Sequence, residues 1–383
     1  MKDSENFGLE NNCNSVEDEE LSTSESSILM NDPFDPKKID ITTKQLTIDL
    51  LIKRMAAYPE EIDLNTYFQR KQGLWSDKQQ SQLIESILIK FPLPAFYFDA
   101  SNNDKWLVVD GLQRLTALKR FVVTKDLFLT GLEFLTDLEG ITYDKLSRPL
   151  QRQIDETQIV TYQINAGTPD DVKYNIFKRL NTGGVTLEQQ EIRHAVFQGV
   201  SSEFVASLAN CNEFKTVTQN LVSPERMLDR EFVTRFVAFY TKDINVSYQS
   251  DMETFLNDGM RDIKNLTVTE RDTIKQNFIQ SMILAKKLFG AWAFRKADNL
   301  ERRKPLNKAL FEVWSVILAK LSENDRDKLL QYKTILWHKF VNIMQTDPIF
   351  MASITSATGD KTRIIYRHNT INSLVKYVLE YDK

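Results

Sequence analysis

Apolar residues are spaced differently in the two halves of the chain, and the difference predicts two kinds of structure. In LWSDKQQSQLIESILIKFPLP, the apolar positions between Leu83 and Leu88 follow a helical period. Ser76 and Gln79 have the spacing of a capping box at the start of this helix, and Pro92 ends it. Three later runs, AFYFDA, KWLVVD and TQIVTYQINA, are short and rich in aromatic or β-branched residues, which predicts strands.

Helices are predicted for most of the chain after residue 168. The run TPDDVKYNIFKRL predicts a helix that ends at NTGG, and Thr186 with Gln189 predicts the cap of the next helix. Helical spacing recurs in DREFVTRFVAFY, TERDTIKQNFIQSMILAKKLFGAWAF, KPLNKALFEVWSVILAKL and NTINSLVKYVLEY. The expected fold class is therefore α+β, with a mixed domain over residues 36–200 and an all-helical domain over residues 201–383.

The N-terminal tail differs in charge from the rest of the chain. Residues 1–35 contain ten Asp or Glu residues and one lysine, which predicts a disordered acidic tail. Removing its nine net negative charges from the whole-chain value of -4 leaves the remaining residues with a formal charge of about +5. A mildly basic body permits contact with nucleic acid or nucleotide phosphates without requiring it.

Two functional classes are disfavoured by composition. No apolar run reaches the length of a membrane span or resembles a signal peptide, so we expect a cytoplasmic protein without membrane contact. Cys13 and Cys211 are far apart and lack a Cys-x-x-Cys arrangement, which disfavours a disulfide framework and a thiolate zinc site.

The run VVDGLQRLTALKRF joins a predicted strand to a predicted helix through Asp-Gly. Gly111 would form a tight turn where a ligand can approach the backbone, and the amides of the helix N-terminus favour an anion. Arg114 adds a forked cation suited to a phosphate oxygen, and Gln113 adds an amide. Asp110 would bind a cation, accept a hydrogen bond from a sugar hydroxyl, or orient water. The structural alternative is that Asp110 caps the helix and Arg114 pairs with a nearby acid.

Three segments give these residues a wider context. In order, YFQRKQGLWSDKQQSQLIESILIKFPLP, LVVDGLQRLTAL and FKRLNTGGVTLEQQEIRHAVFQG resemble the N-terminal domain of GmrSD-type restriction systems, a ParB/sulfiredoxin-like family with an Asp-Gly-Gln-Gln-Arg motif. DREFVTRFVAFY and FMASITSATGDKTRIIYR look like the family's helical continuation. The resemblance implies a ParB/sulfiredoxin-like domain that binds nucleotide with Mg²⁺ and, in several members, hydrolyses nucleoside triphosphates in defence against foreign DNA.

The resemblance also implies roles for single residues. Asp110, Gln113 and Arg114 would support hydrolysis, and Asp110 would also be the metal ligand. The residues expected to bind nucleotide phosphates are Gln69, Arg70, Gly111, Arg179, Asn181, Gly183 and Gly184. Gly183 and Gly184 could equally form only a turn between helices. An isolated arginine such as Arg70 more often pairs at the surface than with a ligand.

Leu112 departs from the family motif, which has a glutamine at this position. If that amide positions water or a phosphate, this protein binds nucleotide but turns it over slowly. If the position is a spacer that faces the helix packing, nothing is lost.

Other catalytic motifs are missing from the sequence. His194, His338 and His368 are scattered, so no HNH nuclease cluster is visible, and no P-loop motif occurs. The expected function is an Mg-dependent NTPase that acts as sensor or regulatory component of an antiphage or DNA-restriction system, with DNA and a separate nuclease or effector subunit left open as partners. The alternative is a non-catalytic DNA-binding or partner-binding module that has lost turnover. ParB-like DNA cleavage and small-molecule phosphotransfer rank below both.

Overall fold

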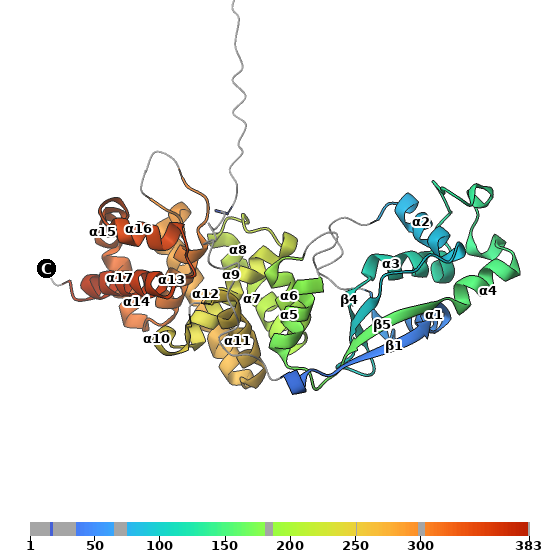
Figure 1. The fold of residues 1–383 in the computed structure, drawn as a ribbon. Coiled ribbons are helices and arrows are strands. Elements are labelled where there is room, and N and C mark those ends of the chain that lie inside the picture. The colour runs from blue at the N-terminus through green and yellow to red at the C-terminus, as the bar shows by residue number, and fades with distance from the viewer. Residues whose placement is uncertain are drawn as a thin grey trace, which may run out of the picture. The chain divides into compact units, whose positions relative to one another are not determined.

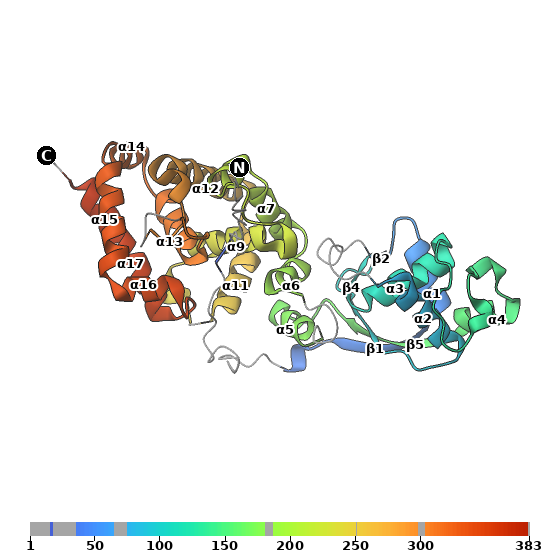
Figure 2. The same cartoon turned by 90° about the horizontal axis from the view of Figure 1, so that it is seen from above.

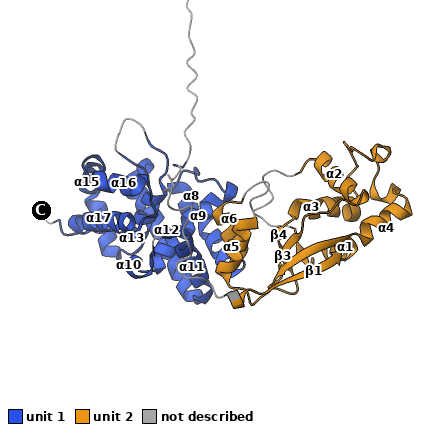
Figure 3. Cartoon of the chain, viewed as in Figure 1, with its two compact units in different colours: residues 1–31, 198–383 blue, residues 32–197 orange. Residues whose placement is uncertain are grey.

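The computed structural model describes residues 16–17, 36–64, 75–180, 187–249, 251–297 and 303–381. Contacts divide the chain into two compact units (Figure 3), one of residues 32–197 and one of residues 1–31 together with 198–383. We call them the mixed unit and the helical unit. The mixed unit contains a small sheet and helices, and the other contains helices, which confirms the predicted α+β class.

Five strands form one sheet in the mixed unit (Figure 1), in the order β1-β5-β3-β4-β2. Their bounds are β1 Ile41–Thr47, β2 Ile62–Asp63, β3 Phe96–Asp99, β4 Trp106–Asp110 and β5 Gln158–Ile164. The pairs β1–β5 and β3–β4 are antiparallel, whereas β3–β5 and β2–β4 are parallel. The apolar pattern predicted β3, β4 and β5 but neither of the two edge strands.

Helices of the mixed unit pack on both faces of the sheet. They are α1 Ile48–Ala56, α2 Asp77–Leu88, α3 Leu112–Leu118, α4 Arg148–Glu156, α5 Asp170–Leu180 and α6 Gln189–Val196. Alternation along β3 places Phe96 and Phe98 in one apolar core with side chains of α1 to α4. Asp99 points to the opposite face, where its carboxylate pairs with Lys173 of α5 at 3.2 Å. Both side chains are nearly buried, so the ion pair fixes α5 to the sheet.

The observed N-caps of α2 and α6 can be compared with the predicted ones. Ser76 and Gln79 form the predicted capping box of α2, with both reciprocal hydrogen bonds present. The predicted cap of α6 is wrong: the N-cap is Glu188, which forms a capping box with Glu191. The spacing of Thr186 and Gln189 fits a capping box equally well, but the helix begins two residues later than that pair requires.

The helical unit is built around an aromatic core. Its helices are α7 Val200–Ala209, α8 Asn212–Val217, α9 Leu228–Thr241, α10 Ile244–Ser247, α11 Met252–Asn265, α12 Val268–Phe289, α13 Lys308–Ala319, α14 Glu323–Gln331, α15 Lys333–Thr346, α16 Pro348–Thr355 and α17 Lys361–Leu379. Phe214, Phe232 and Phe311 contact one another with ring centroids 5.0 to 6.5 Å apart. None of the helices in the described part of the chain is both long and apolar enough to cross a bilayer.

Two residues of the acidic N-terminal segment are described, and both contact the helical unit. Val16 forms a parallel bridge with Leu306, and the N–H of Glu17 donates to the Leu306 carbonyl at 2.8 Å. The Glu17 carboxylate pairs with Lys296 and accepts a hydrogen bond from the Asn307 side chain at 2.9 Å. The rest of the predicted disordered tail lies outside the described residues.

A buried carboxylate joins three helices of the helical unit. Glu312 of α13 is fully buried and accepts hydrogen bonds from Nε and Nη2 of Arg367 at 3.1 and 2.7 Å. His368 lies 3.2 Å from the same oxygen, and Arg235 of α9 lies 3.7 Å from the other. The two arginines belong to the segments DREFVTRFVAFY and FMASITSATGDKTRIIYR, so the structure brings these distant sequences together at one charge.

Candidate functional site

The predicted strand-to-helix junction is present at the end of β4. Asp110 is the last residue of β4, Gly111 is the N-cap of α3, and α3 continues into a wider π-helical turn over Lys119–Thr124. Gly111 has a φ of +103°, a left-handed conformation that other residues adopt only with strain. A Cβ on this glycine would meet the Phe96 ring at 2.5 Å. The backbone conformation and the close approach of β3 therefore both require a glycine here, and the predicted role of Gly111 in phosphate binding stays a prediction.

Arg114 is the most constrained residue of the junction. Its side chain is 9 % exposed, and its guanidinium lies over the Phe96 ring at 4.4 Å. The fork donates hydrogen bonds to the carbonyls of Pro94 and Ala95 and, at 2.6 Å, to Oδ2 of Asp110. Burial holds the pKa of Arg114 below its usual value, and the charge of Asp110 offsets part of this shift. The guanidinium thus ties the start of β3 to the end of β4, which agrees with the structural alternative for this residue.

Asp110 is held by this arginine and still reaches solvent. Its side chain is 40 % exposed, and Asp110 is not the N-cap of α3, because Gly111 occupies that position. The register places Tyr97 of β3 opposite Asp110, next to a bulge in the β3–β4 pairing. Tyr97 stacks on Tyr162 of β5 with the centroids 4.8 Å apart. Burial, then Tyr162 and Asp110, raise the pKa of Tyr97, so its hydroxyl stays protonated and can donate a hydrogen bond.

The sequence did not single out these tyrosines as site residues. AFYFDA correctly predicted a strand, and its period of two separates Tyr97 from the core phenylalanines. Nothing in that pattern gives the pairing register that sets Tyr97 beside Asp110, because the bulge changes the register by one residue.

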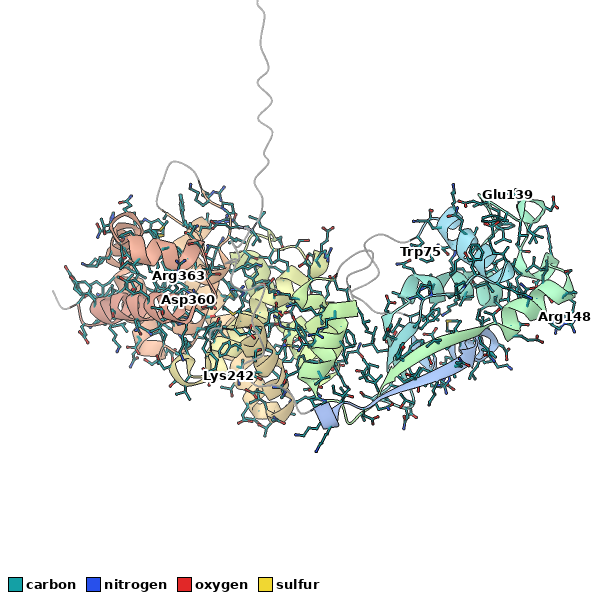
Figure 4. All side chains as sticks on the ribbon, in the orientation of Figure 1. Trp75, Glu139, Arg148, Lys242, Asp360 and Arg363 are labelled. Carbon is teal, nitrogen blue, oxygen red and sulfur yellow. The ribbon has the colours of Figure 1, made fainter. Side chains whose placement is uncertain are left out.

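Gln113 connects the junction to the segment that precedes α2. Its Oε1 accepts a hydrogen bond from the backbone N–H of Trp75 at 3.2 Å, and Figure 4 labels this tryptophan. On the other side of the segment, Ile62 and Asp63 of β2 pair with β4. Both described ends of segment 65–74 are thus attached to the β4–α3 region. Gln69 and Arg70 themselves lie outside the described residues.

The remaining predicted residues are only partly placed. Arg179 lies in the last turn of α5, the helix that Lys173 fixes to the sheet. Asn181, Gly183 and Gly184 lie outside the described residues, so the second phosphate site predicted there stays a prediction.

The position that departs from the family motif faces the protein interior. Leu112 is 9 % exposed and packs in the apolar core of the mixed unit. In this chain the side chain at 112 is therefore part of the packing, as the spacer interpretation of this position requires. The polar contacts of the junction come from Asp110, Gln113 and Arg114.

A half-exposed carboxylate, fixed by a buried arginine at a strand-glycine-helix junction, defines a candidate anion and cation site in an α+β domain. Within the described part of the chain, no three His, Cys, Asp or Glu side chains gather as a metal-binding group. A cation here would therefore be held by few protein ligands.

Residues 59–198 match the family described as the GmrSD restriction endonuclease, N-terminal domain. The predicted resemblance is confirmed over this range, which includes every predicted site residue. The match indicates a role in a restriction or antiphage system. No curated protein and no solved structure matches the chain.

Proposed function

We propose that the mixed unit binds a nucleoside triphosphate with Mg²⁺ at Asp110 and that the chain acts as a sensor or regulatory component of a restriction or antiphage system. One observation carries the proposal: the Asp110 carboxylate reaches solvent while a buried guanidinium fixes its second oxygen. The two carbonyl contacts hold the guanidinium in place, and the guanidinium in turn fixes the orientation of the solvent-facing Asp110 carboxylate.

Within this proposal Arg114 positions Asp110 and does not clamp a phosphate. Its fork is engaged by two carbonyls and the carboxylate, so few of its five N–H groups remain for a ligand. The positive charge of Arg114 also offsets the negative charge of Asp110 that would otherwise repel a triphosphate. The phosphate-clamp role predicted from the sequence is replaced by an orienting role.

The free Asp110 oxygen fits a magnesium ion better than a softer metal. Mg²⁺ is commonly held by one or two carboxylates, with substrate phosphates and water completing an octahedron, so a single aspartate is a sufficient protein ligand. When bound, the ion would neutralise charge on the phosphates. Gln113 Nε2 and the Tyr97 hydroxyl are the neighbouring donors that would orient phosphate oxygens or water.

The second candidate is the non-catalytic DNA-binding or partner-binding module. The engagement of Arg114 inside the fold favours it, because a structural role already accounts for that residue. It predicts no nucleotide affinity at Asp110 and DNA binding that weakens steeply with salt.

The deciding experiment titrates ATP, GTP, CTP and UTP with Mg²⁺ into the full chain and measures phosphate release from each nucleotide that binds. Asp110→Asn preserves the shape and the contact to Arg114 but removes the charge. Asp104→Asn is the matched control, because Asp104 is exposed in the β3–β4 turn and its side chain holds no ion pair among the described residues. We expect release to fall about a hundredfold or more in Asp110→Asn and to stay unchanged in Asp104→Asn.

The other possible outcomes of this experiment lead to different conclusions. Mg²⁺-dependent binding without release would restrict the function to sensing. No binding of any of the four nucleotides, together with salt-dependent DNA binding, would replace the proposal with the second candidate.

A further inference from the structure

A groove lies between two helices at the C-terminal end of the helical unit. α15 packs against α17, with α16 beside them, as both views show (Figures 1 and 2), and the groove between α15 and α17 measures about 700 Å³. The side chains that line it are amides, hydroxyls, aliphatic groups, two tyrosines and one lysine, with no carboxylate. Its polar lining includes Lys339, Asn342, Asn369, Thr370, Ser373 and Tyr377.

The helices that form this groove carry no acidic residue. The sequences of α15, α16 and α17 contain no Asp or Glu, whereas the whole chain has a net charge of -4. The two acids between them, Asp347 and Asp360, are N-caps whose carboxylates accept backbone hydrogen bonds. Asp347 also accepts a hydrogen bond from the Tyr366 hydroxyl at 2.9 Å. Figure 4 labels Asp360 and the nearby Arg363 at the start of α17. Apart from the exposed Glu380 that follows α17, this scarcity of carboxylates favours a polyanionic ligand.

The basic surface continues to the other side of α17. A second hollow of about 580 Å³ shares Ile365 and Asn369 with the groove and is lined by Lys242, Lys320 and Lys376. Lys242, labelled in Figure 4, pairs with Asp262 at 2.6 Å. The one carboxylate lining this hollow, that of Asp243, accepts the N-cap hydrogen bond of α10. Lysines therefore line both hollows beside α17.

An exposed aromatic ring lies at the wall of the groove. Tyr377 is 46 % exposed, and the Lys339 ammonium lies 4.2 Å from the centroid of its ring. Because this ammonium covers one face of the ring, a base would stack on the opposite face, and the lysine would neutralise its phosphate. The neighbouring hydroxyl and amide groups suit phosphate and sugar oxygens, which carry no sequence information.

We propose that the surface across α17 binds a single strand of nucleic acid, with the backbone along Lys339 and Lys376 and a base on Tyr377. A stacking ring requires unpaired bases, which is why a single strand fits better than a duplex. This surface belongs to the helical unit, so the proposal does not depend on nucleotide binding at Asp110.

The test measures fluorescence anisotropy of a labelled dT15 oligonucleotide with the full chain over a series of salt concentrations. Lys339→Gln with Lys376→Gln removes two exposed charges of the surface. Lys264→Gln with Lys287→Gln is the matched control, because both lysines are exposed on α11 and α12 and line neither hollow. We expect the first pair to weaken binding about tenfold or more and to reduce the salt slope by about 1.4, whereas the control pair changes neither.

Further measurements separate the alternatives. Tyr377→Ala should weaken dT15 binding about tenfold, since one stacked base is lost. Asp110→Asn should leave it unchanged. Absence of salt-dependent dT15 binding, equal loss in the control pair, tighter binding of a 15-base-pair duplex, or equal competition by polyglutamate would each overturn the proposal.

Discussion

Two arginine-carboxylate pairs of nearly equal length occupy opposite environments in this chain. Arg367 and Glu312 are 2.7 Å apart in the helical unit, and neither is exposed. Arg114 and Asp110 are 2.6 Å apart in the mixed unit, and the Asp110 side chain is 40 % exposed. The buried pair can contribute only to the stability of the protein interior, whereas the half-exposed pair presents a fixed carboxylate to solvent. Burial, not the ion pair itself, separates a structural charge from a candidate for chemistry.

The most disruptive way to test this comparison is to neutralise the buried carboxylate. Burial raises the pKa of Glu312, but Arg367, then His368 and Arg235, bring it below the ordinary value, so the group is a carboxylate. Glu312→Gln would leave two arginines without their buried countercharge. We expect the free energy of unfolding of the helical unit to fall by about 3–5 kcal/mol in a urea titration.

Glu380→Gln is the control for this substitution, because it removes an exposed carboxylate at the end of α17. Equal stability of Glu312→Gln and Glu380→Gln would contradict the structural role of the buried set.

A third carboxylate sharpens the comparison because its partners are backbone amides. Glu85 of α2 is 3 % exposed and accepts hydrogen bonds from the N–H groups of Glu133, Phe134 and Leu135. Burial opposes its ionisation, but these three donors hold the pKa of Glu85 below the usual value. A depressed folded-state pKa gives stability that is present above the unfolded-state pKa and is lost as the pH falls through the folded value.

We therefore expect Glu85→Gln to destabilise the mixed unit by about 1–3 kcal/mol at pH 7. The difference from wild type should shrink as the pH falls below about 4.3, because Glu85 is then protonated first in the unfolded chain and, at lower pH, in the folded one as well. Thermal unfolding of both proteins between pH 7 and pH 3 measures this. Glu156→Gln, an exposed position at the end of α4, should show no such pH-dependent difference. A stability difference between wild type and Glu85→Gln that stayed constant over this pH range would show that ionised Glu85 does not stabilise the fold.

The smallest effect on stability is expected at Asp110. Asp110→Asn retains an oxygen that can accept from Arg114, and solvent reaches the site, so we expect a loss below about 1 kcal/mol in urea titration. The same variant should lose nucleotide turnover, as proposed above. A stability loss as large as that of Glu312→Gln would show that the two pairs do the same work and would remove Asp110 as a site.

The elements with their own internal signals were predicted from the sequence. The helix from Asp77 to Leu88 has both an apolar stripe and a capping box, and β3, β4 and β5 have apolar faces. β1 was missed because its seven residues, ITTKQLT, are mostly exposed and become a strand by pairing with β5. β2 has only two residues, so it has no period to detect.

The candidate site shows the same limit. The sequence correctly predicted that Asp110, Gly111 and Arg114 meet at a strand-to-helix junction. It did not predict that Arg114 binds the carbonyls of Pro94 and Ala95, because that contact depends on how β3 enters the sheet. The same tertiary arrangement brings the Phe96 ring so close to Gly111 that a side chain would not fit there. The sequence around Gly111 gives no sign of this contact.

The strand order also has a consequence for synthesis on the ribosome. β5 lies between β1 and β3, and it pairs with both, although it follows β3 by nearly sixty residues in the chain. During translation, β1 therefore has no neighbour in the sheet until residues 158–164 have left the exit tunnel. The Asp110 junction is translated earlier, but Tyr162 can join it only after that point. We expect the mixed unit to remain open to chaperones until β5 emerges and then to close in one cooperative step.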